Sequence, residues 1–536
     1  MNVLSAHPLR RATFVAGVAI VVGALGAMPL AASAAPPPAG HTLAANTRFY
    51  VPPPAQGSTQ QELQLLLHGQ FKDAALIADM EATPQAVWLT GETAAEAALP
   101  GSLGSQEANF QVQQQVRQAL LGAQFQNAVP VFVAYNIPGR DCSEYSAGGA
   151  PSDAAYASWI SAISSALGNA HAVVLVEPDG LANLPGYCGA TYAADFPEIT
   201  NTTRIDDISS AVNTLEGDPN VAVYIDAGHS AWQTTGNIAE VLTAAGVAKA
   251  QGFFLDVSNY QYATNNVFYG SWVSSCIAYA TVNEATTQAE ALADASTLDS
   301  ADNNPTGAFN SCANQYWNGG GPTTNIGEQF GAYNGVAMSP YGVWTETSSV
   351  QDLNASGIDA SFQGLLAGTV PTTHFVIDTS RDGLGPNNMS LYAGAPYDQD
   401  SGVISTLESG NWCNPPGSGT GILPTANTST IPDSLDSYLP AKTSLLDAYL
   451  WVKTPGQSDG QCDAAGGVRT WSDAEYTPPI SGWPASTAAA FSTFDPLWSL
   501  QTNSVFTDPA AGAWFSQQAL QLAENASPAL NFPFPT

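Results

Sequence analysis

The stretch Ala172-Val173-Val174-Leu175-Val176, followed at once by Glu177-Pro178-Asp179, is the clearest indication of the fold class in this sequence. Its five apolar residues are continuous, which is typical of a parallel strand that is buried on both faces. Similar apolar runs recur along the chain, and each ends in polar residues. They are 86–89, 129–135, 221–225, 252–255, 374–377 and 448–452.

Between several of these runs lie stretches with apolar residues at helical spacing. Residues 154–167 (AAYASWISAISSAL) and 205–215 (IDDISSAVNTL) are two of them, and Asp206 and Asp207 favour the N-terminus of the second helix. Strands that alternate with helices predict a parallel α/β fold with right-handed crossovers. Seven runs come close to the eight strands of a β/α barrel, and an open doubly wound sheet is the alternative.

Three long excursions interrupt the alternation, at roughly 261–345, 383–446 and 463–512. They are rich in Asn, Gly, Ser, Thr, Trp and Tyr. Loops of this length in a compact domain are usually lids or binding loops. We therefore predict that they cover a cleft.

The charge balance limits the partners that this chain can have. It carries 12 Lys+Arg against 45 Asp+Glu, a formal net charge of -33. Nucleic acid and an anionic membrane surface would repel such a chain, so we expect neither as a partner. A neutral polysaccharide carries no such penalty. One further hypothesis is an acidic working medium, in which protonation of carboxylates would relieve the self-repulsion.

The N-terminus reads as a targeting segment. Arg10 and Arg11 precede an apolar run at 14–30, and Ala32-Ser33-Ala34 supplies a small-residue cleavage site. We predict a secretory signal peptide at 1–34, a short linker at 35–45 and one domain at 46–536, which would be secreted and monomeric. A membrane anchor at the N-terminus is the alternative reading.

Six cysteines follow the predicted cleavage site, an even number that favours disulfides in a secreted chain. Six cysteines allow fifteen connectivities, and the sequence alone leaves them open. We guess that neighbours along the chain pair with one another. The cysteines are Cys142, Cys188, Cys276, Cys312, Cys413 and Cys462.

Carboxylates follow most of the predicted strands. If the strands form one barrel, at least six carboxylates meet at one rim, where crowding raises the pKa of one of them and produces a general acid beside ionised partners. That arrangement suits glycoside hydrolysis. A single Asp after a strand is more often a helix cap. The carboxylates are Asp141, Glu177, Asp179, Asp226, Asp256, Asp378, Asp382 and Asp459.

Tryptophans offer platforms for sugar rings, although each of them could equally be a core residue. The candidates are Trp88, Trp232, Trp272, Trp344, Trp412 and Trp451. Two other enzyme classes fail on the sequence. Residues 456–460 (GQSDG) match the serine-hydrolase elbow, but that motif needs a later His, and the last one is His374. The scattered histidines form no metal-ligand motif, so we expect no metal.

Two segments resemble the signatures of glycoside hydrolase family 6. They are 135–142 (YNIPGRDC) and 174–184 (VLVEPDGLANL). Shorter stretches at 224–229, 257–260, 377–381, 412–414, 451–453 and 512–515 also look like the family, in family order, over roughly 47–532. The resemblance implies a distorted, incomplete β/α barrel of about seven strands, with long loops over the cleft. It further implies inversion at β-1,4-glucosidic bonds of cellulose or a related glucan, without metal or organic cofactor.

The resemblance also assigns roles to residues. Asp179 would be the general acid, Asp141 would raise the pKa of Asp179, Tyr135 would press on the sugar ring, and Asp459 would be the base. Substrate-binding positions, with Asp226 as a supporting carboxylate, would be Trp88, Asp226, His229, Trp232, Asn259, Trp412, Asn414, Lys453 and Gln457. The family's disulfides match the pairs 142–188 and 413–462.

The sequence departs from the family at two places. Gln457 stands where the family usually has Glu, and Asp256 stands where Asn is usual. Both changes bear on the pH optimum and on the task of Asp459. The long excursions favour a cellobiohydrolase that works from chain ends. An endoglucanase is the alternative, and a glucan-binding protein without catalysis is a more remote one.

Overall fold

The computed structural model describes residues 43–91, 105–299, 304–316, 336–395, 398–428, 445–462, 497–498 and 507–530. The predicted signal peptide and most of the linker lie outside the described residues. Seven strands form one sheet, in which every pairing is parallel. They are β1 (Val87–Thr90), β2 (Val131–Tyr135), β3 (Ala172–Val176), β4 (Val221–Asp226), β5 (Gly252–Leu255), β6 (His374–Asp378) and β7 (Leu446–Leu450).

The order of the strands separates the two architectures that the sequence left open. They follow one another as β1-β2-β3-β4-β5-β6-β7, whereas a doubly wound sheet reverses its order at a switch point. The edges β1 and β7 are joined by two hydrogen bonds outside the ladder. The amide of Ala86 donates to the Trp451 carbonyl at 2.9 Å, and Trp88 Nε1 donates to the Val452 carbonyl at 2.8 Å. The sheet is therefore a curled, incomplete barrel, as predicted, and the doubly wound alternative is wrong.

Both faces of the strands are buried, which explains their continuous apolar runs. One hydrophobic cluster includes Val133, Leu175 and Tyr224, and a second includes Phe132 and Val174. Because successive side chains of a strand point to opposite faces, the two clusters lie on opposite faces of the sheet. The second is continuous with apolar side chains of the surrounding helices.

The last strand begins two residues earlier than predicted, at Leu446 rather than at residue 448. Asp447 interrupts the apolar run, which hid the start of the strand. Its carboxylate is buried and fully partnered: it accepts hydrogen bonds from Tyr224 Oη at 2.6 Å and Gln251 Nε2 at 2.9 Å, and pairs with His374 Nδ1 at 2.8 Å. A polar residue can thus sit inside this strand because its oxygens find partners there.

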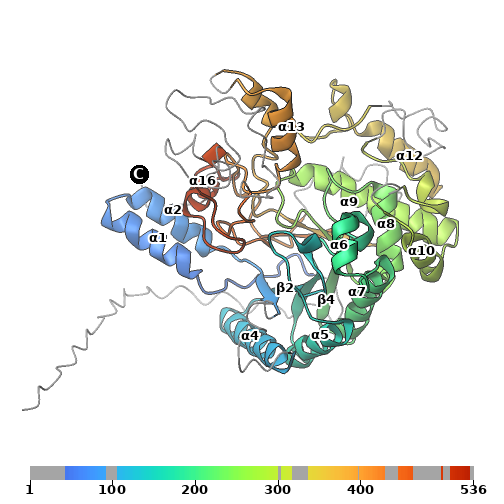
Figure 1. The fold of residues 1–536 in the computed structure, drawn as a ribbon, viewed down its shortest axis with the longest axis horizontal. Coiled ribbons are helices and arrows are strands. Elements are labelled where there is room, and N and C mark those ends of the chain that lie inside the picture. Colours follow the sequence, from blue (N-terminus) through green and yellow to red (C-terminus); the bar gives the residue numbers. More distant parts are fainter. Residues whose placement is uncertain are drawn as a thin grey trace, which may run out of the picture. The chain divides into compact units, whose positions relative to one another are not determined.

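Helices follow most of the strands and lie on the outside of the sheet, as Figure 1 shows around β2 and β4. The first α7 residue is Asn201, not a residue near Asp206 as predicted, because Thr200 and Thr203 form a capping box ahead of it. The helices between strands are α4 (Ser105–Gln126), α5 (Asp153–Leu167), α6 (Gly189–Asp195), α7 (Asn201–Leu215), α8 (Thr235–Ala244), α9 (Ala263–Ala278), α10 (Gln288–Ala295), α12 (Ser356–Leu366) and α13 (Ser401–Ser409). Short 3-10 or π turns occupy Asp141–Ser143, Pro185–Tyr187, Val247–Lys249, Tyr279–Asn283, Gly307–Ser311, Gln351–Leu353 and Met389–Ala393.

Three helices from the two ends of the described chain pack together beside the barrel seam. The helices α1 (Gln56–Leu67), α2 (Phe71–Glu81) and α16 (Ser516–Glu524) share an apolar cluster whose largest member is the buried Trp451, directly after β7. Gln61 of α1 donates to the Ser516 carbonyl at 2.8 Å and accepts from Trp514 Nε1 at 2.7 Å. Segments far apart in the sequence thus cover the edge of the sheet at β7.

The first half of the first long excursion, at residues 261–299, is largely helical rather than an open loop. It contains α9, whose Trp272 is buried and stacks on Trp344 at a centroid distance of 5.5 Å. Crossover helices of a barrel have to bury one face, and apolar residues within 263–278 serve that purpose. The prediction that all of 261–345 covers a cleft is therefore wrong for this part. Most of the third excursion lies outside the described residues.

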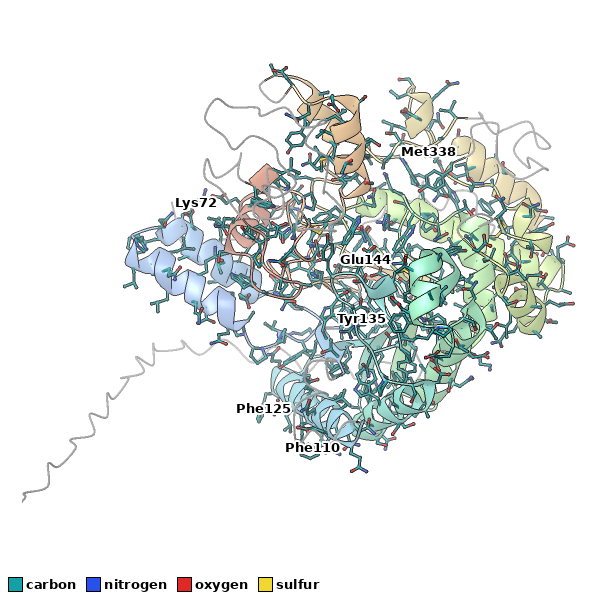
Figure 2. All side chains as sticks on the ribbon, in the orientation of Figure 1. Lys72, Phe110, Phe125, Tyr135, Glu144 and Met338 are labelled. Atoms are coloured by element: carbon teal, nitrogen blue, oxygen red, sulfur yellow. A yellow bond between two sulfur atoms is a disulfide. The ribbon has the colours of Figure 1, made fainter. Side chains whose placement is uncertain are left out.

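All six cysteines pair with their sequence neighbours, as predicted. The disulfides join Cys142 to Cys188, Cys276 to Cys312 and Cys413 to Cys462. Figure 2 shows Tyr135 in the interior, whereas Phe110 and Phe125 project from α4 away from the strands. No helix in the described part of the chain combines the length and apolarity that crossing a bilayer requires.

Candidate active site

A cavity of about 950 Å³ is lined by the loops that follow the carboxyl ends of the strands. This is the end of a β/α barrel at which catalytic groups gather. Nearly all of the residues predicted from the sequence meet there. Its lining includes Trp88, Tyr135, Asp141, Asp179, His229, Trp232, Asn259, Trp412, Lys453, Gln457 and Asp459.

Two predicted substrate-binding residues, Asp226 and Asn414, do not line the cavity. Both are buried behind its wall. Asp226 Oδ2 accepts hydrogen bonds from the amides of Leu181 and Ala182 at 3.3 and 3.1 Å, which fixes the loop that carries Asp179. Asn414 exchanges two hydrogen bonds with Asp459, at 2.8 and 3.0 Å. Asp226 thus has the place of a supporting carboxylate that the resemblance implies, whereas Asn414 supports Asp459 instead of lining the cavity as a substrate-binding residue.

Asp179 combines backbone strain with electrostatic crowding. It follows β3 and has a φ of 65°, and Asp141, after β2, has a φ of 57°. Left-handed backbone is unfavourable for residues with a Cβ and is found most often at functional sites. Burial, followed by the carboxylates of Asp226 and Asp141, holds the pKa of Asp179 well above its usual value, although Lys453 opposes this. Asp179 can therefore keep a proton at a pH where an ordinary Asp has lost it.

Asp141 and Tyr135 are connected through a serine that the sequence analysis did not single out. The amide and Oγ of Ser146 both donate to Asp141 Oδ2, at 2.7 and 2.8 Å, and Ser146 Oγ lies 2.8 Å from Tyr135 Oη. The Arg140 guanidinium lies over the Tyr135 ring, 4.5 Å from its centroid. Burial raises the pKa of Asp141 even though Ser146 and Arg140 stabilise its charge. The group holds the Tyr135 ring and the Asp141 carboxylate in fixed positions.

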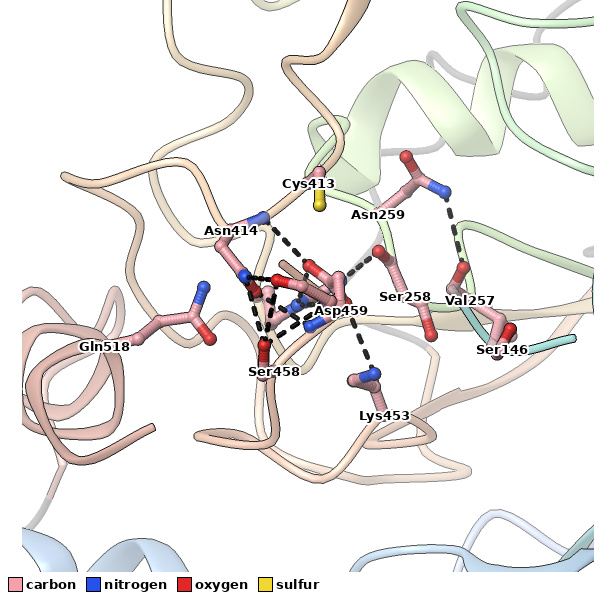
Figure 3. A network of polar contacts seen from close by, with 12 residues as sticks. Ser146, Val257, Ser258, Asn259, Cys413, Asn414, Lys453, Ser458, Asp459 and Gln518 are labelled. Atoms are coloured by element: carbon pink, nitrogen blue, oxygen red, sulfur yellow. Dashed lines mark hydrogen bonds and ion pairs between the residues drawn. The ribbon is translucent and has the colours of Figure 1, made fainter. Parts of the chain in front are cut away.

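Asp459 is surrounded by cations. Arg381 Nη1 lies 2.9 and 2.8 Å from its two carboxylate oxygens, and Lys453 Nζ lies 3.2 Å from Oδ1. Figure 3 shows Asn414, Ser458 and Lys453 gathered around this carboxylate. Burial alone would raise the pKa of Asp459, but the charges of Arg381 and Lys453 outweigh it and lower the pKa. Asp459 is thus an ionised acceptor, in contrast to Asp179.

Arg381 is the main residue that the sequence analysis missed. It is fully buried and lies over the Tyr260 ring at 4.2 Å, and its second nitrogen donates to the Ser258 carbonyl. The sequence contained a signal for it, because Arg381 follows a predicted strand and has Asp378 and Asp382 beside it, in a chain with 12 Lys+Arg in all. An arginine that is buried at such a place has to pair with a carboxylate.

Several carboxylates at the rim hold backbone rather than face the cavity. Asp378 accepts from four amides, those of Ser258 at 3.2 Å, Ser380 at 2.9 Å, and Val452 and Lys453 at 3.0 Å each. Glu177 accepts in the same way from Asn136 and Ile137. Asp256, which the sequence placed beside the cleft, is buried below the loop that follows β5 and accepts from the Gln261 amide at 3.2 Å.

The tryptophans divide into two groups. Trp88, Trp232 and Trp412 line the cavity, whereas Trp272, Trp344 and Trp451 are core residues. Trp88 meets Tyr135 edge-on, at 5.5 Å and 89°. Beside Trp232, burial lowers the pKa of His229 to about 3, and its Nδ1 accepts from the Ala231 amide at 3.2 Å. The neutral ring therefore offers an Nε2–H donor to a ligand.

The buried carboxylates predict a stability that declines as pH rises. Burial raises the pKa of Glu240 and Glu177 to about 7 and that of Asp226 to about 6. A raised folded-state pKa gives stability that is present below the usual carboxyl range and lost as pH rises through the folded pKa. His229, whose pKa is lowered from 6.5 to about 3, opposes this trend below pH 6.5. Because the raised carboxyl groups outnumber it, we expect the free energy of unfolding to fall between pH 4.5 and 8, with Glu240 accounting for about 3 kcal/mol.

Urea denaturation at a series of pH values measures this slope. Glu240→Gln is the informative variant, because the Thr306 hydroxyl, which donates to Glu240 Oε1 at 2.7 Å, can reverse its hydrogen bond toward an amide. That variant should show a flatter profile. A wild-type stability that rises over this range would contradict both the expected slope and the hypothesis of an acidic medium.

Among the described residues, no group of three or more His, Cys, Asp or Glu side chains is arranged to hold a metal ion. The chemistry that the cavity supports is that of its two unlike carboxyl groups. Asp179 has a raised pKa, Asp459 has a lowered pKa and is paired with Arg381, and aromatic side chains line the same cavity. These groups are the ones that acid-assisted hydrolysis of a glycosidic bond requires.

Comparison with known proteins gives a consistent result. The family model described as glycosyl hydrolases family 6 matches residues 44–526. Endoglucanase 1 of Streptomyces halstedii is 32% identical over 264 residues, which make up 48% of this chain and 73% of the relative. Probable 1,4-beta-D-glucan cellobiohydrolase C of Aspergillus terreus is 26% identical over 415 residues, 74% of this chain and 60% of the relative. The catalytic domain of Cellulomonas fimi Cel6B shares the fold, with a TM-score of 0.50 at 22% identity, and the match covers 93% of this chain and 98% of that one.

The curled parallel barrel, with an acid and an ionised carboxylate at its carboxyl end, defines a glycoside hydrolase. The chain belongs to glycosyl hydrolases family 6, as the segments at 135–142 and 174–184 predict. Its relatives carry the names of endoglucanases and of cellobiohydrolases. The family thus indicates a cellulase activity.

Proposed function

We propose that this protein is a secreted cellobiohydrolase, which hydrolyses β-1,4-glucosidic bonds of cellulose with inversion and releases cellobiose from chain ends. The observation that carries the hydrolase part is the contrast between Asp179, whose pKa is raised, and Asp459, whose pKa is lowered, in one cavity. The three disulfides support secretion, because such bonds persist in oxidising compartments. The predicted mature chain from residue 35 onward would act as a single catalytic domain.

In this proposal Asp179 gives its proton to the glycosidic oxygen as the bond to the anomeric carbon breaks. A water molecule attacks that carbon from the opposite face and passes its proton toward Asp459, directly or through a second water. The charge of Asp141 keeps Asp179 protonated until then, and Tyr135 presses on the ring at the cleavage point. Inversion is proposed from the family resemblance, since the water and the acid act on opposite faces.

The chain-end mode is supported by contacts between loops around the cavity. Tyr145, on the loop after β2, meets Trp412, on the segment after β6, at a centroid distance of 6.0 Å. Its hydroxyl also donates to the Cys462 carbonyl after β7, at 3.3 Å. Tyr341 and Pro386 from two of the excursions add to the cavity lining. Loops that touch one another around a cleft restrict entry by the middle of a polymer.

An endoglucanase is the second candidate. The finding that favours it is the helical nature of the first half of the first excursion, since α9 is buried in the core instead of covering the cleft. A relative with 32% identity also bears the name endoglucanase.

Product analysis separates the two modes. The mature protein is incubated with swollen cellulose at about pH 5, and soluble products and the length of the insoluble chains are followed over time. Cellobiose should dominate from the first time points, with little shortening of the insoluble chains. A spread of oligomers with a rapid fall in chain length would assign an endoglucanase, and the absence of any product would contradict the hydrolase itself.

A further inference from the structure

The cavity contains more acidic side chains than the proposed reaction uses. Besides Asp141, Asp179 and Asp459, its lining includes Glu144 and Glu408, and both of these are exposed. Neither forms an ion pair among the described residues. Figure 2 labels Glu144 near Tyr135 in the central part of the molecule. Glu144 and Glu408 could therefore act on the substrate without taking part in the reaction.

The two glutamates belong to segments that meet at the cavity. Glu144 directly precedes Tyr145, and Glu408, in the last turn of α13, stands four residues before Trp412. The ring contact between Tyr145 and Trp412 brings the two segments together. A glucan that stacks on Trp412 would therefore pass two segments that each carry a carboxylate, although the Glu408 carboxylate also accepts a hydrogen bond from the Met389 backbone.

The described cavity lining contains more carboxyl groups than cations. The cations in this described lining are Arg140 and Lys453. Lys453 is paired with Asp459, and Arg140 donates to the carbonyls of Tyr135 at 2.5 Å and Ser146 at 2.8 Å. Partial burial, followed by the charge of Asp141, raises the pKa of Glu144, and the second cause is consistent with a negative potential at this place. A cleft in which one sign of charge is in excess attracts the opposite charge and repels its own.

We infer that Glu144 and Glu408 are specificity-determining residues, which reject β-1,4-glucans with anionic substituents and favour those with amino groups. The inference rests on the proposed glucanase function and deepens it. Uronic acid or carboxymethyl groups would meet like charge beside Trp412, whereas a protonated glucosamine unit would meet opposite charge. Neutral glucan would be handled alike with or without the two carboxylates.

The test compares carboxymethyl-cellulose with hydroxyethyl-cellulose of the same degree of substitution, for the wild type and the double variant Glu144→Gln/Glu408→Gln. At 20 mM salt we expect the anionic-to-neutral rate ratio to rise by roughly 3- to 10-fold in the double variant. In 1 M NaCl, where the Debye length is about 3 Å, the wild type should approach the double variant. Glu198→Gln, which removes one exposed charge outside the cavity lining, should leave the ratio unchanged.

A second measurement uses the protonated β-1,4-linked glucosamine dimer and cellobiose as competitive inhibitors at pH 5. The dimer should lose affinity in the double variant, and cellobiose should not. An unchanged polymer ratio together with unchanged inhibition would overturn the role of the two glutamates while leaving the hydrolase intact. A wild type that releases no product from swollen cellulose would instead refute the proposed function.

Discussion

Asp179→Asn is expected to lower kcat on cello-oligosaccharides by about 10³-fold, within the range of general acid catalysis. Asn has the same shape as Asp but cannot donate a proton of suitable acidity. The structure gives the physical basis, since burial and the charges of Asp226 and Asp141 keep Asp179 protonated. Rates on cellotetraose and its dissociation constant, measured separately, should show lost turnover with retained binding.

The leaving group makes this prediction specific to an acid. Dinitrophenyl β-cellobioside releases a phenolate that needs no protonation, so the Asp179→Asn variant should retain most of its activity on that substrate. Asp195→Asn, an exposed position on α6, serves as the matched control and should behave as the wild type. Equal losses on both substrates would assign Asp179 to positioning rather than to proton transfer. Binding of glucan by a wild type that never shows turnover would support the glucan-binding alternative.

Asp378→Asn is expected to destabilise the fold by about 3 kcal/mol, the cost of leaving buried donors without an acceptor. The Ser380 and Val452 amides donate to one carboxylate oxygen and the Ser258 and Lys453 amides to the other. In the variant one oxygen becomes an NH₂ group, which faces two N–H donors. Since Ser258 and Lys453 also line the cavity, turnover should fall as well.

The matched control is Asp400→Asn at the N-cap of α13. Asp400 also accepts hydrogen bonds from two amides, those of Gly402 at 2.8 Å and Val403 at 3.0 Å. Unlike the bonds to Asp378, the bond from the Gly402 amide is exposed to solvent. Asn is as good an N-cap as Asp, and water can compensate there, so its free energy of unfolding should change by less than about 0.5 kcal/mol. Urea unfolding of both variants measures the difference. Equal, small losses of stability in the two variants would mean that Asp378 does not hold together the loops that follow β5, β6 and β7.

The sequence predicted the barrel and most of the cavity because both depend on local patterns. Continuous apolar runs mark strands buried on two faces, and polar residues directly after them are brought to one rim by parallel pairing. Asp141, Asp179 and Asp459 were found in this way. The same reasoning failed at Asp447, because a polar residue inside a strand is tolerated only when distant partners such as Tyr224 satisfy it.

The position of a carboxylate after a strand does not predict whether it is a catalytic or a structural residue. Asp226, Asp378 and Asp179 all follow predicted strands. Asp226 and Asp378 accept hydrogen bonds from backbone amides, whereas Asp179 lines the cavity. The tryptophans show the same limit. Nothing local separates Trp88, which lines the cavity, from Trp344, which stacks in the core.

By itself the sequence determined the fold class, the glycosidase signatures, the disulfide-bearing cysteines and the strongly acidic charge of this protein. The opposite pKa shifts of Asp179 and Asp459, and the burial of Arg381 against Asp459, came from the three-dimensional arrangement alone. The physical reason is that a pKa depends on burial and on charges a few ångströms away, and those neighbours come from segments as distant as residues 381 and 459. The spacing of residues along the chain does not show which charged groups lie close together in the fold.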